Sequence, residues 1–179
     1  MGKIEDLEVF NGEGYQLSRL DKVIAAARAN SVWPLPFATS CCGIEYMGSM
    51  GSNYDVARFG MERMSFSPRQ ADLLIVAGTI SKKLAPVLKK VYEQMSEPKW
   101  VIAMGACASS GGFYRAYHVV QGVSRDIPVD IYIPGCPPTP EAVLQGIMQI
   151  QDRIKKGVSA YDDSRLAQEA KLAKAESLK

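Results

Sequence analysis

The residues of this 179-residue chain that could do chemistry are its four cysteines, Cys41, Cys42, Cys107 and Cys136. Four thiolates can bind a [4Fe–4S] cluster, a [2Fe–2S] cluster or a structural zinc ion. The N-terminal residues lack the basic and then apolar order of a secretory signal. We therefore expect a reducing compartment, in which grouped cysteines more often bind metals than form disulfides.

The cysteines follow segments whose composition is typical of short buried strands. The predicted strands span residues 35–39, 72–77, 100–104 and 129–133. The second of them contains four consecutive apolar residues and is followed by Gly78. That pattern indicates a strand that is buried on both faces.

Amphipathic helices are expected around these strands. Residues 84–95 carry apolar side chains at the 3.6-residue spacing of a helix, and residues 18–27 predict a shorter helix of the same kind. Thr139, Pro140 and Glu141 supply a capping residue, a proline at the first helical position and an acid in the first turn, so another helix begins there. The alternation of strands and helices predicts an α/β fold with a parallel sheet.

Parallel strands place their carboxyl ends at one edge of the sheet, where open α/β proteins bind ligands. Because every cysteine follows a predicted strand, we expect the four thiols to converge at that edge. Adjacent cysteines would point to opposite faces of a regular strand, so we also expect an irregular backbone at Cys41 and Cys42. Zinc sites usually space paired cysteines two to four residues apart. An iron–sulfur cluster is therefore favoured over zinc, and buried thiols or a disulfide are the remaining alternative.

Composition and charge fit one globular domain. The chain is 47% hydrophobic and 22% charged, and its net charge is +2. This charge is too small to indicate nucleic acid or a polybasic membrane patch. No stretch approaches the roughly 18 consecutive apolar residues of a transmembrane helix. We expect an N-terminal segment (1–17), an α/β domain (18–158) and a charged C-terminal tail (159–179).

Several motifs around the cysteines resemble those of a known family. They are Trp33-Pro34 ahead of Cys41-Cys42-Gly43, Ser67-Pro68-Arg69-Gln70, Met104-Gly105-Ala106-Cys107 and Pro134-Gly135-Cys136-Pro137-Pro138. Over residues 18–155 the chain resembles the NuoB/PSST subunit of respiratory complex I. Ser65 stands where that family usually has arginine, and Arg63 lies just upstream. The small subunits of nickel–iron hydrogenases are similar in part, but they typically carry Cys-x-x-Cys where this chain has adjacent cysteines.

The resemblance implies a flavodoxin-like parallel sheet with flanking helices and one [4Fe–4S] cluster on the four cysteines. The cluster would be the terminal carrier of a proton-pumping NADH:quinone oxidoreductase and would reduce quinone. The subunit would lie peripherally on the cytoplasmic side of the inner membrane. Its partners would be the hydrogenase-derived large subunit, a ferredoxin-like two-cluster subunit and the membrane subunit of the quinone site. No nucleotide site is expected here, because the glycine-rich stretch 105–112 lacks the G-x-G-x-x-G spacing.

Four apolar residues near the cysteines in sequence are candidates for lining a quinone cavity shared with the large subunit. They are Trp33, Met47, Met64 and Phe66. Methionine and aromatic side chains suit an apolar ligand pocket. Core or interface packing is the alternative interpretation of all four.

Charged residues near the cysteines form a second set of candidates. Glu45 and Asp55 could transfer protons or form structural ion pairs, with a solvated helix end as the alternative. Arg58, Arg63 and Arg69 are expected to offset the negative charge of thiolate-bound iron. We identify no catalytic residue on this chain.

Two other classes of function remain open from the residues alone. One is an interaction module stabilised by zinc, and the other is the small subunit of a hydrogenase-type complex. The adjacent Cys41 and Cys42 argue against the hydrogenase alternative. The single histidine, His118, is expected to be a surface residue.

Overall fold

A computed structural model of the chain describes residues 11–12, 15–16, 20–157 and 160–161. The predicted N-terminal segment (1–17) and C-terminal tail (159–179) lie largely outside the described residues, and the domain boundaries stay a prediction. Near the N-terminus, β1 (Asn11–Gly12) and β2 (Tyr15–Gln16) pair in antiparallel orientation.

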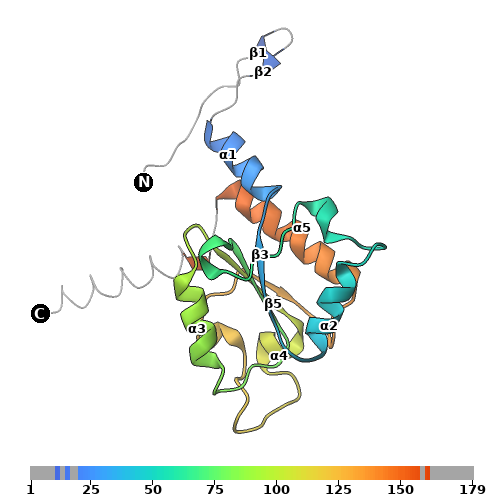
Figure 1. Cartoon of the computed structure of the whole chain (residues 1–179), viewed down its shortest axis with the longest axis vertical. Helices are drawn as coiled ribbons and strands as arrows, with labels where there is room; N and C mark the ends of the chain where they lie inside the picture. Colours follow the sequence, from blue (N-terminus) through green and yellow to red (C-terminus); the bar gives the residue numbers. More distant parts are fainter. Residues whose placement is uncertain (1–10, 13–14, 17–19, 158–159, 162–179) are drawn as a thin grey trace, which may run out of the picture.

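Four parallel strands form the central sheet (Figure 1). They are β3 (Pro34–Ala38), β4 (Leu73–Ala77), β5 (Trp100–Met104) and β6 (Ile131–Ile133), and they lie side by side in that order. Their bounds agree with the predicted strands to within two residues. The predicted α/β class with a parallel sheet and flanking helices is confirmed.

Helices cover both faces of this sheet. Among the described residues the α-helices are α1 (Leu20–Ala29), α2 (Ser40–Ser49), α3 (Ala85–Gln94), α4 (Gly105–Ser110) and α5 (Pro140–Lys156). Short 3₁₀ helices η1 (Val56–Phe59), η2 (Pro68–Gln70) and η3 (Val123–Arg125) lie in the connections. The Thr139 side chain caps α5 by accepting a hydrogen bond from the Ala142 amide, as the sequence predicts.

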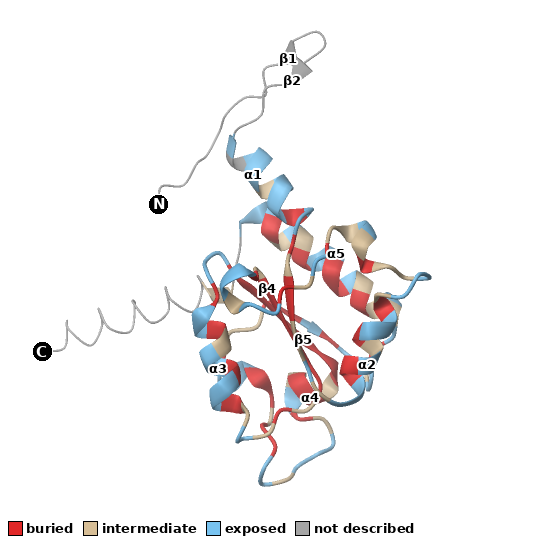
Figure 2. Ribbon diagram, in the orientation of Figure 1, coloured by how far each residue is buried: buried red, intermediate tan, exposed pale blue. Residues whose placement is uncertain are grey.

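The residues of β4 alternate between two hydrophobic clusters, one on each face of the sheet. Leu73, Ile75 and Ala77 pack on the side of α1, α2 and α5. Leu74 and Val76 pack on the side of α3. Every residue of β4 and β5 is buried, which Figure 2 shows in red at the centre of the molecule. Two-sided burial explains why the apolar run in β4 is continuous rather than alternating.

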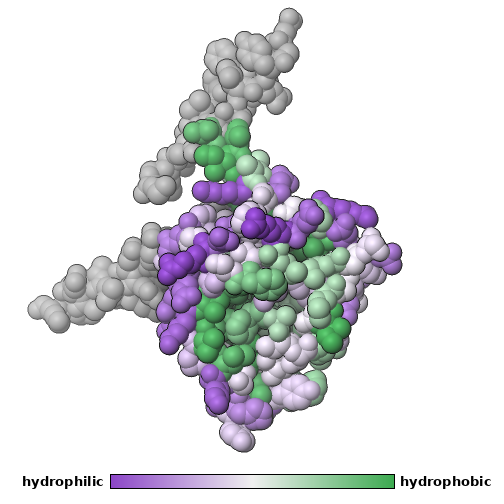
Figure 3. Space-filling view, in the orientation of Figure 1, coloured by the Kyte–Doolittle hydropathy of each residue, from purple (hydrophilic) through white to green (hydrophobic). Residues whose placement is uncertain are grey.

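β3 forms one edge of the sheet. The segment after η1 returns along its outer side, where the Ser65 amide donates a hydrogen bond to the Pro34 carbonyl at 2.9 Å. Figure 3 shows an apolar area on this face, between α3 and α2, with polar residues around it. An extended apolar surface of this kind is typical of a face that contacts other proteins.

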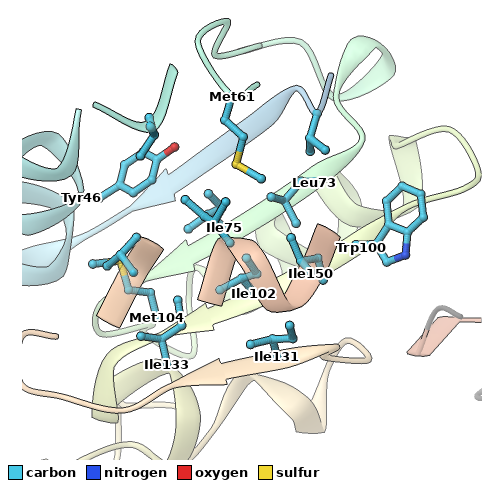
Figure 4. Close-up of a cluster of buried hydrophobic side chains, with 14 of the residues drawn as sticks. Tyr46, Met61, Leu73, Ile75, Trp100, Ile102, Met104, Ile131, Ile133 and Ile150 are labelled. Carbon is cyan, nitrogen blue, oxygen red and sulfur yellow. The ribbon is translucent and has the colours of Figure 1, made fainter. Parts of the chain in front are cut away.

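α5 holds the cluster on the α1, α2 and α5 side together. Ile147 and Ile150 are fully buried in it, and Figure 4 shows Ile150 between the side chains of β4 and β5. Gln151 Nε2 donates hydrogen bonds to the carbonyls of Ala29 (3.0 Å) and Phe59 (2.7 Å). These bonds fix α1 and η1 against α5.

We expect Ile150→Ala to lower the free energy of unfolding by about 2–5 kcal/mol, because it removes buried methyl groups and leaves a cavity. Met148→Ala is the matched control, since Met148 lies on the same helix and is 45% exposed. It should change the stability by less than about 0.5 kcal/mol. Urea unfolding followed by circular dichroism measures both. Equal losses in the two variants would contradict the assignment of the core.

Candidate metal centre

The structure brings the four cysteines to the carboxyl edge of the sheet. Cys41 and Cys42 lie in the first turn of α2, directly after β3, and Cys107 lies in the first turn of α4, directly after β5. Cys136 lies in the loop after β6. Cys42 and Cys107 are buried, whereas Cys41 and Cys136 are exposed. One side of the group therefore faces the core and the other faces solvent.

A sharp turn connects β3 to α2. Ser40 adopts a φ of +61°, which is unusual for a residue with a side chain. Thr39 Oγ1 lies 2.8 Å from the Thr79 carbonyl and donates a hydrogen bond to it, which anchors the end of β3. The irregular backbone therefore lies at Ser40, one residue before the predicted position at Cys41 and Cys42.

Cys41 and Cys42 are themselves helical. Successive helical residues diverge by about 100°, against about 180° on a strand. The tight turn at Ser40 thus lets α2 begin early enough to present both thiols on one side.

Glycine backbone lies directly against two of the thiols. Gly105 has a φ of +90°, and a Cβ atom built on it would lie 2.5 Å from Cys42 Sγ. A Cβ atom on Gly112 would lie 3.3 Å from Cys107 Sγ. The Ala106 amide donates a hydrogen bond to the Gly135 carbonyl at 2.8 Å. The start of α4 is thereby joined to α2 and to the Cys136 loop.

The thiols lie close enough to influence one another electrostatically. The pKa of the Cys42 thiol is raised from 9.0 to about 12, and burial is the largest cause. The charges of the neighbouring Cys41, Cys107 and Cys136 and a hydrogen bond with Cys41 contribute to this rise. Four thiolates in this position therefore need a positively charged group among them.

The number and type of the ligands bear on what that group can be. In the part of the chain that the structure describes, no set of three or more His, Cys, Asp or Glu side chains is arranged to hold a metal ion. A single zinc ion binds sulfur at about 2.3 Å and so requires four tightly clustered ligands. An iron–sulfur cluster is likewise held by four cysteine thiolates. Four thiols at one edge of the sheet therefore fit the donor set of either group.

Three of the four candidate quinone-cavity residues lie away from the cysteines. Trp33 precedes β3, and the bond between Ser65 and Pro34 places Met64 and Phe66 near the same end of that strand. The cysteines follow the opposite end of β3, roughly 13 Å further along the strand. Met47 lies on α2, the helix that carries Cys41, and is 58% exposed. The quinone assignment of all four residues stays a prediction.

The charged candidates have local partners. The Arg63 guanidinium lies 4.3 Å above the Trp33 ring. The Asp55 carboxylate pairs with Arg58 at 3.9 Å and accepts a hydrogen bond from the Ala57 amide, which caps η1. Asp55 thus has a structural contact that explains its presence.

Glu45 is half-buried on α2, and Arg69 is exposed in η2. Ser65, which replaces the expected arginine, is buried, and its hydroxyl donates a hydrogen bond to the Ser67 carbonyl at 3.1 Å. His118 is exposed, as predicted. The roles of these charged residues in proton transfer or charge compensation stay predictions.

Two further residues position the thiols, Ser40 and Gly105, and only Gly105 carries a signal in the sequence. Ser40 carries no sequence signal, because serine rarely adopts a positive φ. Gly105 had a signal, since a glycine directly after a buried strand often marks a close approach of backbone.

No helix in the described residues is long and apolar enough to cross a membrane. The fold and the site together define a class: an α/β domain that gathers four thiols at the carboxyl edge of a parallel sheet. Residues 40–150 match the family described as the 20 kDa subunit of NADH ubiquinone oxidoreductase. The chain belongs to this family, which confirms the family predicted from its motifs.

Bacterial relatives share most of the chain. A protein from Flavobacterium psychrophilum that is named as a subunit of NADH-quinone oxidoreductase is 62% identical over 152 residues, which cover 85% of this chain and 84% of that protein. The corresponding protein from Bdellovibrio bacteriovorus is 66% identical over 137 residues, covering 76% and 73%. The names of both relatives thus describe components of a multisubunit oxidoreductase.

Solved structures extend the comparison. A chain of the membrane-bound sulfane sulfur reductase, an archaeal respiratory membrane complex, has a TM-score of 0.71 and 39% identity, covering 76% of this chain and 77% of its own. A chain of an NAD⁺-reducing [NiFe]-hydrogenase has a TM-score of 0.50 and 17% identity, covering 68% and 91%. The second likeness supports the fold alone.

We expect Gly105→Ala to disturb the thiol arrangement, because the new methyl group would meet Cys42 Sγ and the positive φ would be strained. The backbone strain alone costs about 1–2 kcal/mol. Gly48→Ala is the control, since a Cβ atom there meets nothing within 4 Å. Unfolding stability and the reaction rate of the thiols with a maleimide test both variants. If Gly105→Ala matched Gly48→Ala in both measurements, the close approach of Gly105 to Cys42 would be refuted.

Proposed function

We propose that this chain is the electron-transfer subunit of a proton-pumping NADH:quinone oxidoreductase. Cys41, Cys42, Cys107 and Cys136 would hold one [4Fe–4S] cluster, the last carrier before quinone. The observation that supports this proposal best is the gathering of four thiols from three strand ends at one edge of the sheet. Family membership supplies the reaction, because its curated relatives are named for NADH and quinone.

The chain's own residues would hold and insulate this group. When bound, the cluster supplies one-electron transfer. Buried Cys42 and Cys107 would anchor it toward the core, and exposed Cys41 and Cys136 would leave one side open to a partner. The backbone of Gly105 and Gly112 passes against the sulfur atoms, where amide groups can hydrogen-bond to sulfur and tune the potential.

Quinone would bind in a cavity completed by a neighbouring subunit. On α2, Ile44 and Met47 expose apolar side chains beside the cysteine edge. Trp33, Met64 and Phe66 would contribute from the other end of β3. A long apolar substrate could contact both regions, whereas a headgroup alone could not.

The proposed partners follow from this arrangement. The hydrogenase-derived large subunit would close the quinone cavity, a ferredoxin-like two-cluster subunit would supply electrons, and a membrane subunit would admit quinone. We place the chain peripherally on the cytoplasmic side of the membrane. The likeness to a chain of an archaeal respiratory membrane complex supports the association with a membrane complex, though not the side of the membrane.

We expect Cys42→Ala in the native complex to lose or alter the cluster, because a buried ligand is removed. Low-temperature EPR of the dithionite-reduced complex should then lack the fast-relaxing signal of a reduced [4Fe–4S] centre. Ser110→Ala is the control, since Ser110 is exposed on the helix of Cys107. It should leave the EPR signal intact.

Adding quinone tests the second part of the proposal. The signal that depends on Cys42 should disappear when quinone reoxidises the complex. An unchanged EPR spectrum and iron content in Cys42→Ala would refute the ligand assignment. Zinc in place of iron would refute the electron-transfer role and leave an interaction module.

A further inference from the structure

A basic groove lies beside the start of α3, separate from the cysteine side chains. Its volume is about 860 Å³, and it is open to solvent. Four cationic residues and one acidic residue line it: Lys82, Lys89, Arg115, Arg125 and Asp126. All five are exposed. Between them the groove floor is apolar, with Ala85, Pro86, Val119 and Val120 among its residues.

Exposed aromatic side chains project next to this groove. The segment 113–118, here named the aromatic loop, carries Phe113, Tyr114 and Tyr117, which are 71%, 48% and 88% exposed. The ring centroids of Phe113 and Tyr114 lie 4.1 Å apart. In Figure 1 the connection after α4 projects beyond the rest of the domain, and Figure 2 shows much of it exposed. Tyr117 also lines the groove, so the loop and the groove form one surface.

Hydrogen bonds hold this surface in shape. Gln121 Nε2 donates to the Tyr114 carbonyl at 2.8 Å. The Lys82 amide donates to the His118 carbonyl at 2.7 Å, and the Val120 amide donates to the Ile80 carbonyl at 2.9 Å. The loop is therefore tied to the segment between β4 and α3, which contains Ile80 and Lys82. A surface ordered before binding loses little conformational entropy when a partner binds.

We propose that an acidic segment of another subunit of the same complex docks in this groove and against the aromatic loop. Exposed aromatic residues and arginine are enriched at protein interfaces and dominate their binding energy. The groove is lined by four cationic side chains and one acidic side chain, so it would attract carboxylates. The whole chain, by comparison, carries a net charge of only +2. The positive charge is thus concentrated where the aromatic side chains are.

A protein segment fits this surface better than the other anionic occupants. A membrane surface is broad and cannot enter a groove flanked by a projecting loop. A small anionic ligand would normally be enclosed on most of its surface, whereas this groove is open. The proposal needs only that the chain is a subunit of a complex, so it does not depend on the cluster or on quinone.

Two pairs of neighbouring lysines allow a matched test in the intact complex. Lys82 and Lys89 line the groove, whereas the adjacent Lys83 and Lys90 are exposed but do not line it. A carbodiimide joins lysine amines to carboxylates that lie in ion-pair contact. We expect Lys82 or Lys89 to cross-link to an aspartate or glutamate of another subunit, as identified by mass spectrometry. We also expect acetylation of these two lysines to be slowed severalfold relative to Lys83 and Lys90.

Charge reversal gives a second readout. Lys89→Glu should dissociate from the complex at a lower salt concentration than the wild type, because salt screens the remaining attraction. Lys90→Glu should behave as the wild type does. The EPR signal of the assembled fraction should be the same in both variants, which separates this proposal from the one on the cluster.

Several outcomes would overturn the proposal. One is equal acetylation of all four lysines in the intact complex, since the groove would then be open. Another is cross-linking only to carboxylates of this same chain. A third is that Lys82 and Lys89 are protected from acetylation only until detergent removes the lipid, and that they form no cross-link to a carboxylate. A lipid headgroup would then occupy the groove. Equal salt sensitivity of Lys89→Glu and Lys90→Glu would also contradict it.

Discussion

The structure depends on holding four thiols close together, although the charges of ionised thiols repel one another at that distance. Burial and the neighbouring thiols all raise the pKa of Cys42, so the charged form of this group is unfavourable without a cation. An unsupported loop would relax by letting the thiols separate. The chain prevents this by starting α2 and α4 directly at strand ends and by packing Gly105 against Cys42. The convergence is thus imposed by the sheet rather than by the cysteines themselves.

That constraint explains the rest of the scaffold. The strand ends stay in place only if the strands cannot slide, and β4 and β5 are buried on both faces. α5 packs across one face and binds α1 and η1 through Gln151, so elements from both ends of the described domain share one core. A rigid edge of this kind suits electron transfer, because a bound group then keeps a constant distance to its redox partners.

Much of this arrangement could be predicted from the sequence. Apolar runs and capping residues located the strands and α5, and the rule for parallel sheets placed the thiols at one edge. An irregular backbone is expected at Cys41 and Cys42, but its position at Ser40 could not be predicted, because serine has no preference for a positive φ. Trp33 and Phe66 flank the motifs in the sequence, but the order of residues alone does not show that β3 separates them from the cysteines. Asp55 caps η1 and pairs with Arg58, local contacts that residue type alone does not reveal, and its role in proton transfer stays a prediction.

The surface of the domain divides into regions of different chemistry. The face over β3 is apolar, the cysteine edge exposes Cys41 and Cys136, and the groove at the start of α3 is cationic and aromatic. Apolar surface binds many partners without discriminating between them, whereas placed charges select a partner and fix its orientation. Gly112 lies against Cys107, a proposed cluster ligand, and the aromatic loop follows Gly112 directly. A partner that docks on the loop would therefore contact the same piece of backbone that holds the ligand in place.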